Sequence, residues 1–174
     1  MKNLLKIMIF GVFIAVFTGC SSQNTVANAN ISKLLKENEF TFMAQRANPA
    51  NADVVNVLTS MPNSTSTQVL NLDHGYSLKI TKDELIAVLP YFGRMYSSTY
   101  DNTKNSYRFT SKDFNISQSS GKKGSIIYLI NAKDQQNVRK MILEVFPNGK
   151  AYLSIDSTDR QPISYDGYIQ ENSK

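Results

Sequence analysis

Alternation of apolar and polar residues, repeated along most of the chain, is the feature that most restricts its fold. Tyr76, Leu78 and Ile80 alternate with polar residues, and successive side chains of a strand point to opposite faces. The same period predicts strands at residues 40–45, 76–81, 107–110, 114–118, 125–131, 139–145, 151–155 and 163–169. Residues 125–131 are apolar on both faces, so we expect this strand to be central and covered on both sides.

Turn sequences separate these strands. Residues 121–124 and 147–149 have the length and residue types of hairpin turns, and residues 156–162 form a longer polar connection. In the strand over 139–145, we expect Arg139 to share a face with Met141, Leu143 and Val145. Short strands with short turns predict a mainly β domain, an antiparallel meander closed or partly closed into a calycin- or lipocalin-like barrel. Closure would remove the exposed sheet edges.

Two segments fit more than one secondary structure. In residues 51–61 the apolar positions suit a helix as well as a loop with a short strand. Residues 81–84 have the spacing of a helix capping box, yet Leu85, Ala87 and Leu89 alternate as in a strand. The sequence alone leaves both segments open.

The N-terminal residues resemble a bacterial lipoprotein signal. Lys2 and Lys6 precede an apolar run over 7–17, which ends in Phe-Thr-Gly-Cys at Cys20, the only cysteine in the chain. In such a motif the thiol receives a diacylglycerol group and the peptide is cut before it. The run is shorter than the roughly 20 residues of a membrane-spanning helix. We predict a signal peptide over 1–19 and a membrane attachment through acyl chains on Cys20, with ordinary cleavage or an uncleaved anchor as alternatives.

The chain after the signal has the length of one domain. The small, uncharged residues 21–30 predict a flexible tether after the lipidated cysteine, followed by a single domain over 31–174. Apolar residues at helical spacing predict a short helix over 31–37. The tether lacks the acidic residues that mark surface export in some bacterial lipoproteins. We therefore expect a cell-envelope protein on the periplasmic side of the outer membrane.

Charge and composition exclude several function classes. The formal net charge is +5 and the basic residues are scattered, whereas nucleic-acid binders group them. His74 is the only histidine and lies in a turn-like Asp-His-Gly, which gives neither a catalytic triad nor a zinc ligand set. Calcium-loop and phosphate-loop motifs are absent from the sequence. We predict a protein that is not an enzyme and has no metal or cofactor, although a hydrolase site assembled from distant residues stays open.

Four short stretches carry a family resemblance. They are FTFMA at 40–44, LPYFGR at 89–94, FPNG at 146–149 and RQPISYDG at 160–167. Their order and spacing resemble the domain-of-unknown-function family DUF4251, found in secreted proteins and lipoproteins of Bacteroidetes, over about residues 39–170. The resemblance implies a β-rich, barrel-like domain and favours the strand over 84–89. It implies no activity, because none is established for the family.

The LPYFGR stretch is the most concentrated candidate binding element. Tyr91 and Phe92 could form the walls of a ligand pocket, with Arg94 donating to a carboxylate or phosphate group. Arg160 could reach the same rim, where two arginines would suit an anionic head group. The structural alternative is that the rings fill the core at a strand end, Arg94 pairs with an acid, and Arg160 lies in a solvated turn. Ser157 follows an aspartate in a short pattern that carries O-linked glycans in some exported Bacteroidetes proteins, which makes it a candidate modification site.

The leading hypothesis is a lipid-anchored envelope protein that binds an apolar or amphipathic small ligand, without catalysis, in a barrel or cleft. Nine phenylalanines and nine tyrosines supply lining side chains. The alternative is a structural lipoprotein with a solid interior, whose surface docks protein partners. A connected cavity of about 300 Å³ or more would favour the first reading. The sequence identifies neither the ligand nor the protein partners.

Overall fold

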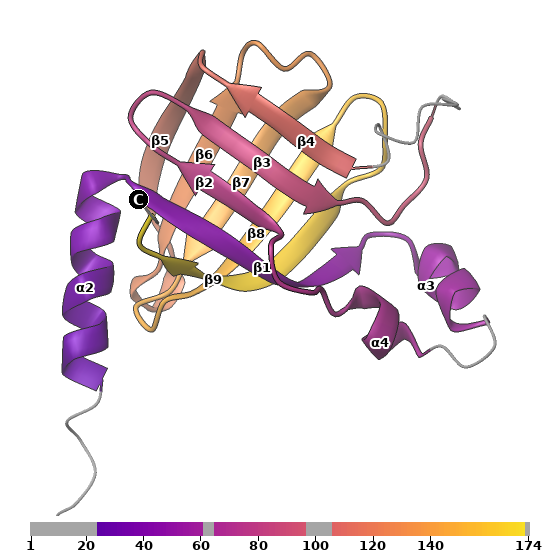
Figure 1. Ribbon diagram of the computed structural model, residues 1–174, viewed down its shortest axis with the longest axis horizontal. Helices are drawn as coiled ribbons and strands as arrows, with labels where there is room; N and C mark the ends of the chain where they lie inside the picture. The colour runs from indigo at the N-terminus through magenta and orange to yellow at the C-terminus, as the bar shows by residue number, and fades with distance from the viewer. Residues whose placement is uncertain (1–23, 61–64, 97–105, 173–174) are drawn as a thin grey trace, which may run out of the picture.

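The computed structural model describes residues 24–60, 65–96 and 106–172, which form an antiparallel nine-stranded sheet curled into a nearly closed barrel (Figure 1). The strands are β1 (Phe40–Pro49), β2 (Ser77–Ile80), β3 (Leu85–Pro90), β4 (Ser106–Ser111), β5 (Phe114–Ser120), β6 (Ile126–Ala132), β7 (Val138–Val145), β8 (Lys150–Ser157) and β9 (Ile163–Gln170). Except for β4 and β5, strands that are neighbours in the chain pair with each other, and β9 pairs with β1, in the order β4-β3-β2-β1-β9-β8-β7-β6-β5. The predicted meander and barrel are confirmed.

The barrel interior is filled by side chains from alternate strand positions. The largest of these side chains are each less than 2% exposed: Tyr128, Tyr165, Phe40, Phe42, Leu78, Ile80, Leu85, Leu89, Ile130, Met141, Leu143 and Leu153. A cavity wide enough for water would give accessible surface to the side chains around it. These twelve side chains therefore pack against one another and against their neighbours. Burial of each contributes about 1.5–3 kcal/mol.

Two expectations about the strand faces are wrong. The outer side of β6 is not covered, because the barrel has no second layer there, and Leu129 is 37% exposed. Arg139 is exposed and does not share the inner face with Met141. The β7–β8 register shifts between Val138 and Lys140. This bulge adds one residue, so Val138 takes the inner position and Arg139 points outward.

The two ambiguous segments adopt different structures. Residues 52–59 form helix α3 (Ala52–Thr59), and the side chain of Asn51 caps it by accepting a hydrogen bond from the Asp53 amide at 2.8 Å. Residues 81–84 form the turn between β2 and β3, in which Thr81 and Glu84 hydrogen-bond each other. Segment 85–90 is accordingly a strand. A further short helix, α4 (Ser66–Leu70), has no counterpart in the sequence prediction.

Helix α2 (Asn24–Glu37) lies at one end of the barrel, opposite α3 and α4 (Figure 1). The hydroxyl of Tyr128 donates to the backbone carbonyl of Leu35 at 3.2 Å. Gly149 allows Ile31 to approach, since a Cβ there would lie 2.7 Å from Cδ1 of Ile31. The helix starts seven residues before the expected 31, so residues 24–30 are helical where we expected a tether. Residues 24–37 contain neither glycine nor proline, so the packed part can propagate toward the N-terminus.

The predicted signal peptide and Cys20 lie outside the described residues. In the part of the chain that the structure describes, no helix has the length and hydropathy needed to cross a membrane.

Strands β4 and β5 follow each other directly but pair with β3 and β6, so the chain makes a corner between them. The carboxylate of Asp134, in the β6–β7 turn, holds this corner. It accepts hydrogen bonds from the hydroxyl of Ser111 and from the amides of Lys112 and Asp113. The hydrogen bond from Ser111, followed by that from the Lys112 amide, lowers the pKa of Asp134 below its ordinary value.

Asp134→Asn is therefore expected to lower the thermal unfolding midpoint at neutral pH. Because the pKa of Asp134 is lower in the folded protein, its stabilising effect is complete above the unfolded pKa of about 3.9 and disappears as the pH falls through the folded value. The difference in thermal unfolding midpoint between the variant and the wild type, measured by circular dichroism, should become smaller below about pH 4. Asp83→Asn, on the exposed β2–β3 turn, is the matched control. If Asp134→Asn lowered the unfolding midpoint by the same amount at every pH, the ionised carboxylate of Asp134 would not be what stabilises the corner.

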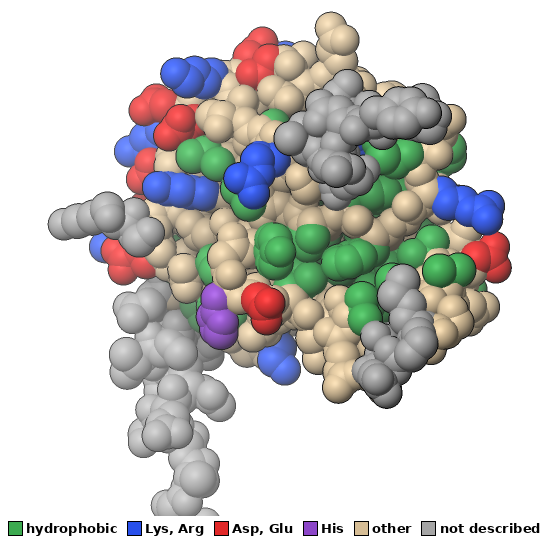
Figure 2. Space-filling model, turned by 45° about the vertical axis from the view of Figure 1, so that its right-hand side comes forward, with side chains coloured by type: hydrophobic (Ala, Val, Ile, Leu, Met, Phe, Trp, Pro, Cys, Tyr) green, Lys and Arg blue, Asp and Glu red, His purple; other side chains and the backbone are tan. Residues whose placement is uncertain are grey.

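Figure 2 shows the face that comes forward when the α3 and α4 side is turned toward the viewer. Hydrophobic side chains form a band across it, and acidic and basic side chains lie close together around the band. Partly buried hydrophobic residues from this side of the molecule pack against the core, among them Val55 and Leu58 of α3 and the Tyr91 and Phe92 pair that follows β3. The helices at this end therefore extend the core beyond the barrel.

Candidate functional site

The chain after β3 crosses to the β8–β9 connection and is hydrogen-bonded to it. The amide of Gln161 donates to the carbonyl of Arg94 at 3.0 Å, and the amide of Tyr96 donates to the carbonyl of Asp159 at 2.8 Å. Met95 and Arg160 form an isolated antiparallel bridge. The LPYFGR and RQPISYDG stretches, which carry the family resemblance, therefore form one physical unit.

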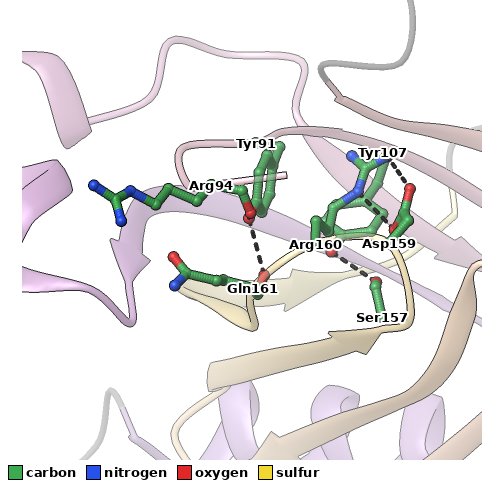
Figure 3. Close-up of polar contacts among 7 residues, drawn as sticks. All are labelled: Tyr91, Arg94, Tyr107, Ser157, Asp159, Arg160 and Gln161. Atoms are coloured by element: carbon green, nitrogen blue, oxygen red, sulfur yellow. Dashed lines mark hydrogen bonds and ion pairs between the residues drawn. The ribbon is translucent and has the colours of Figure 1, made fainter. Parts of the chain in front are cut away.

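The centre of this unit is Arg160, which is only 5% exposed (Figure 3). Its guanidinium donates two hydrogen bonds to Asp159, at 3.1 and 2.9 Å. The guanidinium carbon lies 5.0 Å from the ring centroid of Tyr91 and 4.9 Å from that of Tyr107. The two rings meet edge to face at 5.9 Å. We call Tyr91, Tyr107, Asp159 and Arg160 the arginine clasp, because the ion pair and the rings together offset the cost of burying the charge.

The tyrosine hydroxyls around the clasp form hydrogen bonds with backbone carbonyls and with a side chain. That of Tyr91 lies 2.9 and 3.1 Å from the carbonyls of Arg94 and Gln161, and that of Tyr165 donates to the carbonyl of Pro90 at 2.7 Å. Burial raises the pKa of Tyr107 to about 12 and that of Tyr165 well above its ordinary value. These hydroxyls therefore stay protonated at neutral pH and act as hydrogen-bonding groups.

The structure brings some of the sequence-predicted site residues together. Tyr91 and Arg160 are in contact, and Phe92 packs partly buried against the core. Arg94 contributes its carbonyl, but its guanidinium points away from that of Arg160 (Figure 3), so the two charges do not converge on one rim. Ser157 is 4% exposed, with its hydroxyl 2.9 Å from that of Tyr107. A glycan on Ser157 would have to be attached before the domain folds.

A polar hollow of 280 Å³ lies beside the clasp, between β4 and the β6–β7 turn. Arg108, Gln135 and Asn137 line it together with Arg160. Among the described residues, neither Nη1 of Arg160 nor the neighbouring Oε1 of Gln161 has a hydrogen-bond partner, although both atoms are buried. The clasp is therefore a buried contact that fixes the chain after β3 to the β8–β9 connection, and two buried polar atoms at this contact lack partners in the described part of the chain.

A larger groove, of 720 Å³, lies on the outside of the barrel and was not found from the sequence. We call it the outer groove; its lining comes from β1, β8, β9, the β7–β8 turn and the β5–β6 turn: Gln45, Lys123, Phe146, Pro147, Asn148, Lys150, Ala151, Tyr152, Asp166, Gly167 and Tyr168. Tyr152 is 39% exposed. An aromatic residue at an outward strand position, where a polar one is expected, is the signal that could have pointed to it.

Register fixes the pattern of side chains at the floor of the outer groove. Lys150 pairs with Tyr168, and Tyr152 pairs with Asp166, on the same outward face of β8 and β9. The two tyrosines thus lie on one diagonal and the two charges on the other, within reach of one another. Oδ2 of Asp166 accepts a hydrogen bond from Asn48 at 2.7 Å, which orients the carboxylate.

The outer groove continues into a second hollow of 420 Å³. Gln45, Asp166 and Tyr168 line both, and the second hollow extends to Arg46 and His74. The β1–β9 register shifts between Ala44 and Arg46, so the bulged strand presents Gln45 to both spaces. Among the described residues, no three His, Cys, Asp or Glu side chains gather as metal ligands would.

Comparison with known proteins identifies the family. No curated protein matches the chain. A crystal structure of a DUF4251 family protein from Bacteroides eggerthii DSM 20697 is similar, at 12% sequence identity and a TM-score of 0.49, over 84% of this chain and 88% of that one. The family model described as domain of unknown function (DUF4251) matches residues 22–169. The chain therefore belongs to the DUF4251 family.

Proposed function

We propose that this protein is a lipid-anchored, non-catalytic component of the cell envelope that binds an amphipathic ligand in the outer groove. The signal over 1–19 and the acylated Cys20 would hold it at the periplasmic side of the outer membrane. The observation that carries the proposal is the outer groove itself, in which exposed and half-buried aromatic rings lie beside charged side chains. Its 720 Å³ falls within the usual range of ligand sites.

The packing of the barrel supports a ligand on the outside. The largest inward side chains, such as Phe42, Tyr128 and Tyr165, expose less than 2% of their surface. An apolar ligand inside the barrel would have to displace these rings, and interiors packed at this density resist such changes. On the outer face, Tyr152 and Tyr168 can meet a ligand without any rearrangement of the core.

The chemistry of the buried groups supports binding without catalysis. The raised pKa of Tyr107 leaves its hydroxyl protonated, and Arg160 is committed to Asp159 and two rings. In the outer groove, Asp166 is the only carboxylate among the lining residues of the described chain, and its Oδ2 accepts a hydrogen bond from Asn48. Asp73 lines the second hollow together with Asp166, so a site with two carboxylates is the catalytic alternative to binding.

Native mass spectrometry of the protein purified from its own host tests the proposal. We expect a ligand to accompany the wild type and the Leu129→Ala variant, which removes an exposed apolar side chain outside the groove. The Tyr152→Ala/Tyr168→Ala double variant should lose it. The same spectrum should show acyl chains as added mass on a chain that begins at Cys20.

Retention of the ligand by the double variant would place the site elsewhere. A clean apo mass for all three proteins would contradict ligand binding and would favour the alternative, a structural lipoprotein that docks protein partners. Folding of the double variant is checked by its circular dichroism, and outward positions of a sheet tolerate such changes.

A further inference from the structure

We propose that the ligand of the outer groove is a carbohydrate chain. This inference rests on the proposed function, because it names the chemical class of a ligand for the same site. Its grounds are the exposed aromatic rings, the arrangement of charges and amides around them, and the open, elongated shape of the two hollows.

The aromatic rings suit the flat apolar face of a sugar. A pyranose ring presents C–H groups on its faces and hydroxyl groups around its rim, so it combines an apolar surface with a polar edge. Tyr152, 39% exposed, offers a ring of similar size. Tyr168 offers a second, half-buried ring diagonally across the β8–β9 ladder. Large rigid rings with a polar tip provide this kind of contact at low entropic cost.

The polar groups suit the hydroxyl rim. Asp166 uses Oδ2 for its bond to Asn48, which leaves Oδ1 as an acceptor toward the groove. Lys123 and Lys150 are donors, and within the described residues neither forms an ion pair. Gln45 adds an amide that can donate and accept. Sugar hydroxyl groups need both hydrogen-bond donors and acceptors. The outer groove places both kinds of group next to its tyrosine rings.

The shape of the site favours a chain over a compact ligand. The outer groove and the second hollow share Gln45, Asp166 and Tyr168, so a ligand that lies over Tyr168 can enter both. The second hollow is lined by further hydrogen-bonding side chains, including Asn71 and His74. A fatty acyl chain would instead need a continuous apolar wall, which the charges at Lys150 and Asp166 interrupt.

Isothermal titration calorimetry with the acylated protein in detergent tests this inference. The probes are chitotetraose, maltotetraose and tetragalacturonate, which vary the sugar and the charge. We expect at least one to bind, and Tyr152→Ala to weaken that binding roughly tenfold or more. Tyr152→Phe should retain most of the affinity, because the ring is kept. Leu129→Ala, outside the groove, should bind as the wild type does.

Three results would overturn the inference. One is the absence of heat with all three probes at about 10 mM, which excludes even weak sites. Another is equal binding by wild type and Tyr152→Ala. The last is saturable, Tyr152-dependent binding to phosphatidylglycerol vesicles or to an unfolded peptide, with none to the sugars. If a co-purified ligand still depends on Tyr152 and Tyr168 while the sugars fail, only the carbohydrate assignment falls. If neither a co-purified ligand nor a sugar binds, the proposed function falls as well.

Discussion

Replacement of Arg160 with methionine is expected to lower the free energy of unfolding by about 3–5 kcal/mol. The variant leaves Asp159 without its partner in a largely buried site, and it removes a cation that lies 5.0 and 4.9 Å from two tyrosine rings. Methionine is similar in length, so the loss is mainly electrostatic and not a cavity. Urea unfolding followed by tyrosine fluorescence measures it.

Matched variants separate the stabilising effect of the clasp from the general effect of losing a positive charge. Arg94→Met removes an exposed guanidinium four residues after Pro90 and should change stability by less than about 0.5 kcal/mol. Arg160→Lys keeps the charge but loses the planar fork, so it should remain clearly destabilised. Asp159→Asn/Arg160→Met should recover part of the loss, because no unpaired charge remains. Equal effects at positions 94 and 160 would show that the clasp adds nothing to stability.

Gly167→Ala is expected to lower the free energy of unfolding by more than about 3 kcal/mol, or to prevent folding. A Cβ at this position would lie 2.0 Å from the carbonyl oxygen of Met43 and 2.9 Å from Cε2 of Phe42. The obstacle is the backbone of β1 where it pairs with β9, beside the bulge between Ala44 and Arg46. Relief of the clash would separate two central strands.

Gly75→Ala is the control for this substitution. Gly75 has a positive φ of 110° but open space around it, so the cost there is backbone strain of about 1 kcal/mol. The loss in free energy of unfolding, measured by urea unfolding, should therefore be severalfold larger for Gly167→Ala than for Gly75→Ala. A Gly167→Ala protein as stable as Gly75→Ala would mean that β1 and β9 are less tightly paired than the structure indicates.

Local sequence patterns were enough to predict where the strands lie, but not always which side chains of a strand point into the barrel. The alternation around Leu78 reports burial directly, since a strand has a period of two. The bulge in β7 depends on how β8 aligns with it, and that long-range register moved Arg139 outward. Helix α2 likewise starts at Asn24 because of its packed second half, which the weak local propensities of residues 24–30 do not reveal.

The clasp and the outer groove show why sites are harder to predict than strands. Arg160 lies in a polar connection and looked solvated, but its partners Tyr91 and Tyr107 come from distant parts of the chain. Tyr152 and Tyr168 can be assigned to strands from sequence, yet their diagonal relation follows only from the β8–β9 register. The family resemblance found the stretches that meet at the clasp. It could not show that they contact each other.

The pairing of β1 with β9 has a consequence for how the chain must fold. Thr41 is opposite Gln170, so the first strand of the domain finds one of its two neighbours only in the last. Pairing strands that lie so far apart in the chain requires the closure of a long loop, and such non-local contacts make formation of the barrel slow. One edge of β1 therefore stays unpaired until the C-terminal strand is available, and unpaired strand edges favour aggregation. Pairing of β9 with β1 joins the two halves of the sheet, so a chain that lacks β9 would leave both halves with an additional open edge.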